Sequence, residues 1–164
     1  METGGKETYR VLKSLAENRD ASVEVAALAK RELALFSRDL EPLLYDRLEF
    51  IGAVQALAAR SRMSRIRIAC IDPGPSVRAG HRLVALAQRF SSYIEVRRAS
   101  RDHENLTDTF LVADDTALLY RPLCTRYEGY ADLYAPMEAR EKLRIMDDVW
   151  QQAEPDPEFR RLGI

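Results

Sequence analysis

The sequence predicts an α/β fold in which a mixed sheet has a parallel βαβαβ first half and an antiparallel hairpin in its second half. Apolar runs at 32–36, 65–72 and 93–97 are separated by segments with helical periodicity. A strand that returns to its sheet through a helix lies parallel to the strand before it, with a right-handed crossover. The stretch 106–122 instead places two apolar runs around an acidic turn, which indicates an antiparallel pair.

The elements of the first half follow one another without a linker or an internal repeat. Apolar residues three and four positions apart predict helices, short apolar runs predict strands, and Pro and Gly mark the breaks between them. In chain order we expect a helix at 22–30, a strand at 32–36, a loop at 37–46, a helix at 47–61, a strand at 65–72, a turn at 72–75, a helix at 81–90 and a strand at 93–97.

The second half contains the hairpin and a long C-terminal helix. TFLVAD (109–114) and TALLYR (116–121) are the two hairpin strands, and YEGYADLYA (127–135) could add another. Pro136 suits the first turn of a helix. The apolar stripe that this helix turns to the core consists of Leu143, Met146, Val149 and Trp150.

The two ends of the chain are less regular than its middle. The residues around Tyr9–Leu12 fit a weak helix or a peripheral strand equally well. We expect an N-terminal extension at 1–21, one α/β domain at 22–153 and an irregular tail at 154–164. The length of 164 residues suffices for one domain with a real core, because a domain of about 150 residues buries roughly 70% of its unfolded surface.

The composition is that of an ordinary soluble globular protein, with 46% apolar and 31% charged residues. No run approaches the roughly 20 apolar residues of a membrane span, and the start METGGKETYR lacks the apolar segment of a secretory signal. We therefore expect a cytoplasmic protein with no membrane association. Cys70 and Cys124 belong to no CxxC pair and lie beside no histidine, which favours inert free thiols.

Arginine dominates the basic residues, because only four of the 25 are lysines. Its planar fork suits phosphate and carboxylate groups. A GC-rich genome raises arginine and alanine together, however, and accounts for the bulk of the excess. The formal net charge of −1 weighs against nucleic-acid binding.

The order of elements and several short phrases resemble one half of the phospholipase D superfamily. The phrases are ALAKRELALF, ALAARS, RIRIACID, YIEVRR and the hairpin, all within residues 22–152. The resemblance implies a phospholipase D-like three-layer sandwich. Single-domain members of that superfamily join two half-sites across a dimer axis, so it also implies a homodimer with Thr107 and Arg121 near the two-fold axis.

The catalytic motif of that superfamily is degenerate in this hairpin. The motif runs His, any residue, Lys, four residues, Asp, with Gly and Ser after the return strand. With Asp114 on the aspartate, Thr107 takes the histidine position and Thr109 the lysine position. Arg121 and Pro122 replace the glycine and the serine.

The substitutions remove the groups that the superfamily's chemistry needs. Its histidine attacks phosphorus and its lysine stabilises the phosphoryl charge, whereas a threonine hydroxyl cannot attack without a base. Asp108 points to the opposite face of the strand. His103 has no lysine two positions later, which favours a solvated loop residue over a displaced catalytic histidine. We expect no phospholipase-type turnover, and we interpret Asp114 as a turn-forming residue.

A second, less specific resemblance is to a bacterial domain without an assigned role, which occurs alone or beside an acetyltransferase-like domain. It rests on SRDLEPLLYD, GHRLVALAQR and PDPEFRRL. The chain itself has no Gly-rich loop between a strand and a helix that could cradle coenzyme A. The resemblance implies an acetyltransferase-like companion protein at most, and we expect no cofactor.

Candidate ligand-binding residues follow the carboxyl ends of the expected strands, where open α/β sheets bind ligands. Arg38 and Asp39 follow the first strand, Asp72 follows the second, Arg121 ends the hairpin, and Arg126 begins the next segment. The three arginines could converge on an anionic group, with an aspartate orienting them. The alternative is that these residues form structural ion pairs, Arg38 with Asp39 or Glu41 and Arg126 with Glu128.

His81 opens a helix directly after Gly80, and a helix N-terminus attracts anions through its free N–H groups. It is therefore a further candidate for a phosphate-like ligand, although a lone histidine at this place is more often a cap or a partly buried side chain. No second histidine and no carboxylate lie at ligand spacing, so we expect no metal.

These observations favour a non-catalytic domain that binds an anionic ligand or a partner protein. The first alternative is an enzyme with altered phosphoryl or nucleotide chemistry around Arg38, Asp39, Asp72 and His81. The second alternative is a nucleic-acid-binding module.

Overall fold

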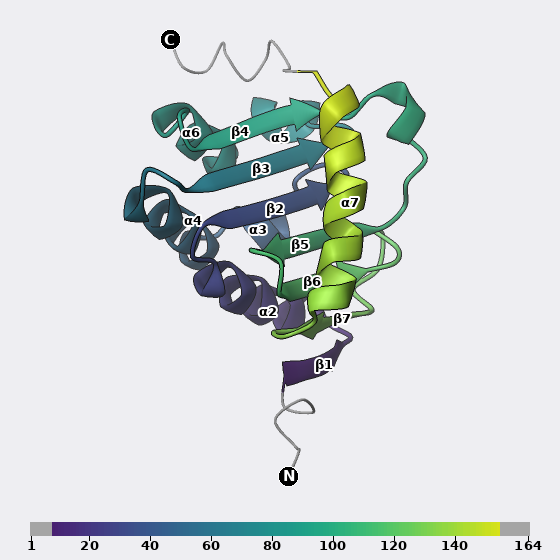
Figure 1. Ribbon diagram of the computed structural model, residues 1–164. Helices are drawn as coiled ribbons and strands as arrows, with labels where there is room; N and C mark the ends of the chain where they lie inside the picture. The colour runs from purple at the N-terminus through teal and green to yellow at the C-terminus, as the bar shows by residue number, and fades with distance from the viewer. Residues whose placement is uncertain (1–7, 155–164) are drawn as a thin grey trace.

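The computed structural model describes residues 8–154 as a mixed sheet covered by helices on both faces (Figure 1). The strands are β1 (Tyr9–Leu12), β2 (Glu32–Ser37), β3 (Arg65–Cys70), β4 (Ile94–Arg98), β5 (Thr109–Ala113), β6 (Ala117–Arg121) and β7 (Gly129–Asp132). The helices are α2 (Leu15–Leu28), α3 (Pro42–Tyr45), α4 (Leu48–Arg60), α5 (Gly74–Arg78), α6 (Arg82–Arg89), the 3₁₀ turn η1 (Arg101–His103) and α7 (Pro136–Gln152).

Strand β2 lies at the junction between the parallel and antiparallel parts of the sheet. The strand order is β1-β7-β6-β5-β2-β3-β4, with β2, β3 and β4 parallel to one another. β5 pairs antiparallel with β2, and β6, β7 and β1 continue the antiparallel part. The predicted α/β class, with a parallel first half and an antiparallel hairpin, is confirmed, and YEGYADLYA does add a strand.

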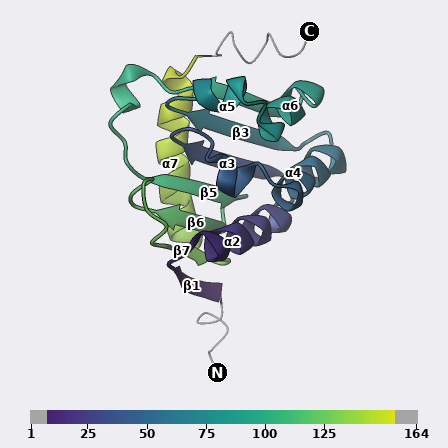
Figure 2. The same ribbon diagram turned by 180° about the vertical axis from the view of Figure 1, so that it is seen from behind.

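Two hydrophobic cores lie on the two faces of the sheet, because successive strand residues point to opposite sides. Leu35 of β2 belongs to the core under α2, α4 and α6, whereas its neighbour Phe36 belongs to the core under α7. Figure 1 shows α7 crossing one face, and Figure 2 shows the other helices on the opposite face. Met146, Val149 and Trp150 of α7 are buried, as the apolar stripe predicted. The predicted three-layer sandwich is confirmed.

The N-terminal part of the chain is more ordered than the sequence suggested. Tyr9–Leu12 is the peripheral strand β1, which pairs antiparallel with β7. The first helix begins at Leu15 rather than at Ser22, because Ser14 and Glu17 form a capping box in which each side chain binds the other residue's backbone N–H. The boundary expected at residue 22 thus falls inside α2.

Two segments expected to be irregular contain short helices. The loop 37–46 holds α3, which starts at Pro42, and the turn after β3 holds α5. Proline suits such starts because it has no N–H to leave unpaired in the first helical turn. At the C-terminal end, Glu154 forms an isolated bridge with Arg98, and the rest of the expected tail, 155–164, lies outside the described residues.

Asp114 ties the hairpin turn to the start of β2. It adopts a left-handed φ of 54°, which an aspartate tolerates better than most residues. Its two carboxylate oxygens accept hydrogen bonds from the backbone N–H groups of Lys30, Arg31 and Glu32, each 3.0 Å long. Asp114 is therefore a turn residue, as interpreted, and it also fixes the neighbouring strand.

We expect Asp114→Ala to lower the free energy of unfolding by about 2–3 kcal/mol, because three N–H groups lose a charged acceptor. The measurement is urea denaturation followed by circular dichroism. The matched control is Asp115→Ala, whose ion pair with Arg140 at 3.6 Å is more than half exposed and whose loss should cost less than about 1 kcal/mol. Equal effects of the two substitutions would contradict this role of Asp114.

Candidate functional site

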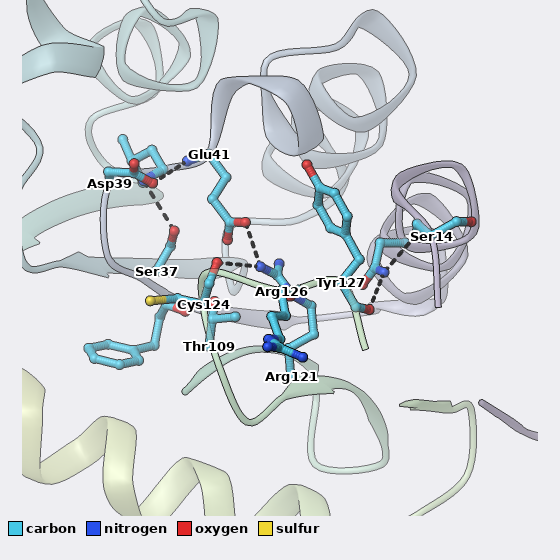
Figure 3. Close-up of polar contacts among 12 residues, drawn as sticks. Ser14, Ser37, Asp39, Glu41, Thr109, Arg121, Cys124, Arg126 and Tyr127 are labelled. Atoms are coloured by element: carbon cyan, nitrogen blue, oxygen red, sulfur yellow. Dashed lines mark hydrogen bonds and ion pairs between the residues drawn. The ribbon is translucent and has the colours of Figure 1, made fainter. Parts of the chain in front are cut away.

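Ser37, Thr109 and Arg121 form a row of polar side chains where β2 ends. The row lies on the face of the sheet that α2, α4 and α6 cover. Thr109 and Arg121 are paired across the hairpin and lie on one face. Phe36 pairs with Phe110, so the next residue of β2, Ser37, comes beside Thr109 on that same face. Figure 3 shows these residues below the loop that carries Glu41.

The two threonines of the degenerate motif have their hydroxyl groups bound to backbone carbonyls. Thr109 is buried, and its Oγ1 donates to the carbonyl oxygen of Phe36 at 2.6 Å. Thr107 is exposed, and its Oγ1 donates to the carbonyl oxygen of Pro122 at 3.3 Å. The Thr107 hydroxyl group thus joins the two ends of the hairpin, and the Thr109 hydroxyl group joins the hairpin to β2.

Arg121 is the largest fully buried side chain, with 1% of its surface exposed. Its Nη2 forms an ion pair with Oε1 of Glu41 at 2.8 Å and also donates to the carbonyl oxygen of Cys124. Its Nε donates to the carbonyl oxygen of Arg126, again at 2.8 Å. The guanidinium group therefore binds two backbone carbonyls of the segment after β6 and joins this segment to the loop after β2 (Figure 3).

The residues around Arg121 are shaped to receive its side chain. Gly129 has no room for a Cβ, which would overlap the carbonyl oxygen of Tyr120 and lie 2.7 Å from Cγ of Arg121. The Tyr127 ring centroid lies 5.6 Å from the guanidinium carbon, within the range of a cation–π contact. Asn18 of α2 donates to the Tyr127 carbonyl at 2.9 Å and so holds this ring in place.

The loop that carries Glu41 has an unusual backbone. Leu40 and Glu41 adopt φ values of 66° and 28°, in the left-handed region that non-glycine residues rarely enter. Hydrogen bonds fix this conformation: the N–H of Leu40 donates to Oγ of Ser37, and the N–H of Glu41 donates to Oδ1 of Asp39. The loop is also tied to α5, because Oγ of Ser76 donates to the Asp39 carbonyl at 2.5 Å.

His81 fastens the same loop to α6. Its Nδ1 accepts the N–H of Leu83, which leaves the proton on Nε2, and Nε2 donates to the carbonyl oxygen of Leu40 at 2.9 Å. The side chain is buried, and burial lowers the pKa of His81. His81 is therefore a neutral helix cap that positions the loop, and both ring nitrogens are occupied by backbone groups.

Burial also acts on Glu41, in the opposite sense. It raises the pKa of the Glu41 carboxyl, and the hydrogen bond and charge of Arg121 offset this only in part. Tyr45 lies close to the pair, and its pKa is raised by burial and by the Glu41 charge. The pair is thus held in a poorly solvated environment, in which an unpaired charge would be costly.

The structure brings together four of the six residues predicted to bind an anion. Asp39, His81, Arg121 and the backbone of Arg126 meet around the loop and the ion pair. Arg38 makes a different contact: its Nη1 donates to the Glu104 carbonyl at 3.2 Å.

Two of the predicted residues contribute little to this network through their side chains. Asp72 is exposed, and its backbone N–H donates to the Arg38 carbonyl at 2.6 Å. The side chain of Arg126 is exposed as well. The residue that sequence reasoning missed is Glu41, which was considered only as a partner of Arg38 and pairs with Arg121 instead.

His103 lies in η1, away from the hairpin strands. Its Nε2 is 3.2 Å from a carboxylate oxygen of Asp148 on α7, and its Nδ1 is 3.4 Å from Oγ of Ser100. Within residues 8–154 no group of three His, Cys, Asp or Glu side chains is placed to hold a metal ion. No helix in that part of the chain is both long and apolar enough to cross a bilayer.

Comparison with protein families gives one match, a family described as "Domain of unknown function (DUF7931)", over residues 14–162. The chain belongs to the DUF7931 family. The sequence of this DUF7931 chain matches no curated protein.

Solved structures similar to the DUF7931 chain include members of the phospholipase D family. Nuc from Salmonella typhimurium, a phospholipase D family member, has a TM-score of 0.66 and 15% identity, over 90% of this chain and 97% of Nuc. NucT from Helicobacter pylori has a TM-score of 0.59 and 10% identity, again over 90% and 97%. The predicted phospholipase D-like fold is confirmed.

Another similar structure belongs to the archaeal chromatin protein TrmBL2, which shows a novel mode of DNA binding. The TM-score is 0.67 at 13% identity, over 92% of the DUF7931 chain and 55% of TrmBL2. The chain thus spans about half the length of that protein. At these identities the likenesses show the fold alone.

We expect Gly129→Ala to destabilise this DUF7931 chain by about 1–3 kcal/mol, because the added methyl group overlaps the backbone and pushes on Arg121. Gly52→Ala is the matched control: Gly52 is exposed within α4, nothing lies within 4 Å of an added Cβ, and alanine favours a helix by up to about 1 kcal/mol. Chemical denaturation of both variants checks the difference. Equal stability of the two would show that Arg121 does not need the space at Gly129.

We expect the free energy of unfolding to fall as the pH drops below 6.5, the ordinary pKa of histidine. The folded state holds His81 neutral because its pKa is lowered, so the unfolded state binds more protons and gains from acidification. His81→Gln, which can still donate to Leu40, should lose this part of the pH dependence. Urea denaturation at about pH 7.5 and about pH 5.5 measures it, and an identical pH dependence in both proteins would contradict the assignment.

Proposed function

We propose that this DUF7931 chain is a non-catalytic domain that acts by binding. The observation that carries the proposal is the state of the hairpin positions where the phospholipase D family has its reactive groups. Thr107 and Thr109 stand there, each with its hydroxyl group donated to a carbonyl oxygen. The neighbouring space is filled by the Arg121–Glu41 ion pair.

The chemistry of the described residues supports this proposal. Attack on a phosphodiester needs a nucleophile with an available lone pair or a base that can take its proton. His81 has both ring nitrogens engaged with backbone groups, and His103 contacts Ser100 and Asp148 instead of the hairpin. Asp108 accepts a hydrogen bond from Tyr120, whose side chain lies on the α7 face of β6. None of these three residues thus binds the hydroxyl group of Thr107 or Thr109 as a base.

The contacts of Arg121 favour a partner protein over a small anion that binds with Glu41 in place. Its guanidinium group is buried and already paired with a carboxylate, so its charge is compensated within the chain. A second copy of the chain and an acetyltransferase-like protein remain the proposed partners. Of the two residues expected near a dimer axis, Thr107 is exposed and Arg121 is not.

A second candidate function is nucleic-acid binding, because the similar structure of TrmBL2 comes from a DNA-binding chromatin protein. The net charge of −1 supports it less than a basic surface would. Affinity for DNA that falls steeply with salt would favour this candidate over a partner protein.

We expect the purified protein to hydrolyse bis(para-nitrophenyl) phosphate no faster than buffer does, at neutral pH and with or without added divalent metal. Thr107→Ala and His103→Ala serve as matched variants and should give the same background, because neither side chain is placed to attack or to protonate. Absorbance of released nitrophenolate measures the rate. Hydrolysis by the wild type that either substitution abolishes would overturn the proposal.

A further inference from the structure

The Arg121–Glu41 ion pair is incomplete on both sides. Only one carboxylate oxygen of Glu41, Oε1, reaches the guanidinium group, at 2.8 Å from Nη2. Among the described residues, the other oxygen, Oε2, and the other terminal nitrogen, Nη1, are buried without a hydrogen-bond partner. An arginine can bind a carboxylate or phosphate through two parallel hydrogen bonds, and this pair makes only one of the two.

The strained backbone that presents Glu41 to Arg121 is a second cost of the pair. Leu40 and Glu41 both have left-handed φ angles, which are strained in non-glycine residues. They persist where surrounding contacts over-determine them, as the bonds from Ser37, Asp39 and His81 do here. Strain of this kind is common where a segment can exchange one set of contacts for another.

Glu41 is the more exposed member of the pair. Its side chain is 15% exposed, whereas that of Arg121 is 1% exposed. While the carboxylate stays in place, its charge repels an external anion and it occupies one donor of Nη2. Once the carboxylate moves, that donor and the unpaired Nη1 become available to an external anion.

We propose that Arg121 is an anion-binding residue and that Glu41 is a built-in carboxylate which occupies its site until an external oxyanion takes its place. The ligand is a group with two oxygens that can bridge Nη1 and Nη2, either a carboxylate or a phosphate. It gains the hydrogen bond from Nη1 that Glu41 leaves unmade. This inference rests on the proposed function, because it treats the site as one that binds without turnover.

The neighbouring groups suit an anion at this position. When Glu41 leaves, Arg121 is the buried charge of the site, with the Tyr127 ring beside it and the hydroxyl group of Ser37 on the same face of the sheet, at the end of β2. Nε donates to the Arg126 carbonyl and one proton of Nη2 goes to the Cys124 carbonyl, so the guanidinium group holds its orientation during the exchange. Nη1 and the second proton of Nη2 are the donors that remain for a ligand.

The test is rescue of a variant that lacks the built-in carboxylate. In Glu41→Ala the buried guanidinium group loses its partner, so the Tm should fall below that of the wild type. Sodium formate or inorganic phosphate should raise the Tm of Glu41→Ala with increasing concentration, and more than sodium chloride does at the same ionic strength. The wild type should show the same difference between the anions only at higher concentration, because the anion must first displace Glu41. Glu49→Ala, which loses only an exposed carboxylate, should respond as the wild type does.

The double variant Glu41→Ala/Arg121→Met identifies the group that binds. It should be insensitive to formate and phosphate, because methionine fills the space of Arg121 without a charge. The proposal is overturned if folded Glu41→Ala does not respond to either anion, or if the double variant responds equally. Should Glu41→Ala fail to fold, the same titration of Glu41→Gly, which also vacates the site and tolerates the left-handed φ at this position, decides by the same outcomes.

The two anions also separate the possible sources of the ligand. Rescue by formate alone indicates a carboxylate, such as an acidic side chain of a partner protein, and rescue by phosphate alone indicates a phosphorylated ligand. The outcome is independent of the phosphodiesterase assay: hydrolysis by the wild type would remove the proposed function, whereas a missing rescue with no hydrolysis would remove only this inference.

Discussion

The rest of the site depends on one constraint, the burial of the Arg121 guanidinium group. Removing such a charge from water costs several kcal/mol, so it persists only with an opposite charge and hydrogen bonds around it. The chain supplies Glu41 and the carbonyls of Cys124 and Arg126. Gly129 is needed because a Cβ there would overlap the Tyr120 carbonyl oxygen and press on the arginine side chain. Arg121 thus links the segment from β6 to β7 with the loop after β2.

The same side chain changes what this end of a phospholipase D-like sheet can do. Catalysis of phosphoryl transfer needs groups aimed at the places where charge develops. Here the threonine hydroxyl groups and most of the guanidinium donors are aimed at the chain's own carbonyls and carboxylate. In the structure these groups hold the hairpin, the segment after it and the loop after β2 together.

Local patterns carried enough information to predict the sheet, its mixed topology and the stripe of α7, because each depends on periodicity within one segment. The early start of α2 was also within reach, since Ser14 and Glu17 have the spacing of a capping box. The role of Glu41 could not be predicted, because its pairing with Arg121 joins a loop to the end of β6, and the register of β2, β5 and β6 brings the two together. Asp39 and His81 were found by their position after a strand and before a helix. Their part in holding the loop depends on backbone groups that no sequence pattern marks.

An apolar filling of the same space would serve stability at least as well as this ion pair. Buried pairs replaced by well-packed hydrophobic residues are often neutral or more stable, because desolvation offsets most of the attraction. The Arg121–Glu41 pair adds two buried polar atoms without partners and two left-handed residues to that cost. Neighbouring positions on the same face, such as Leu35, Leu111 and Leu119, show that the core accepts aliphatic side chains there. Stability alone therefore does not account for a charged pair at this place, and the proposed exchange of the carboxylate partner of Arg121 would give the pair a function.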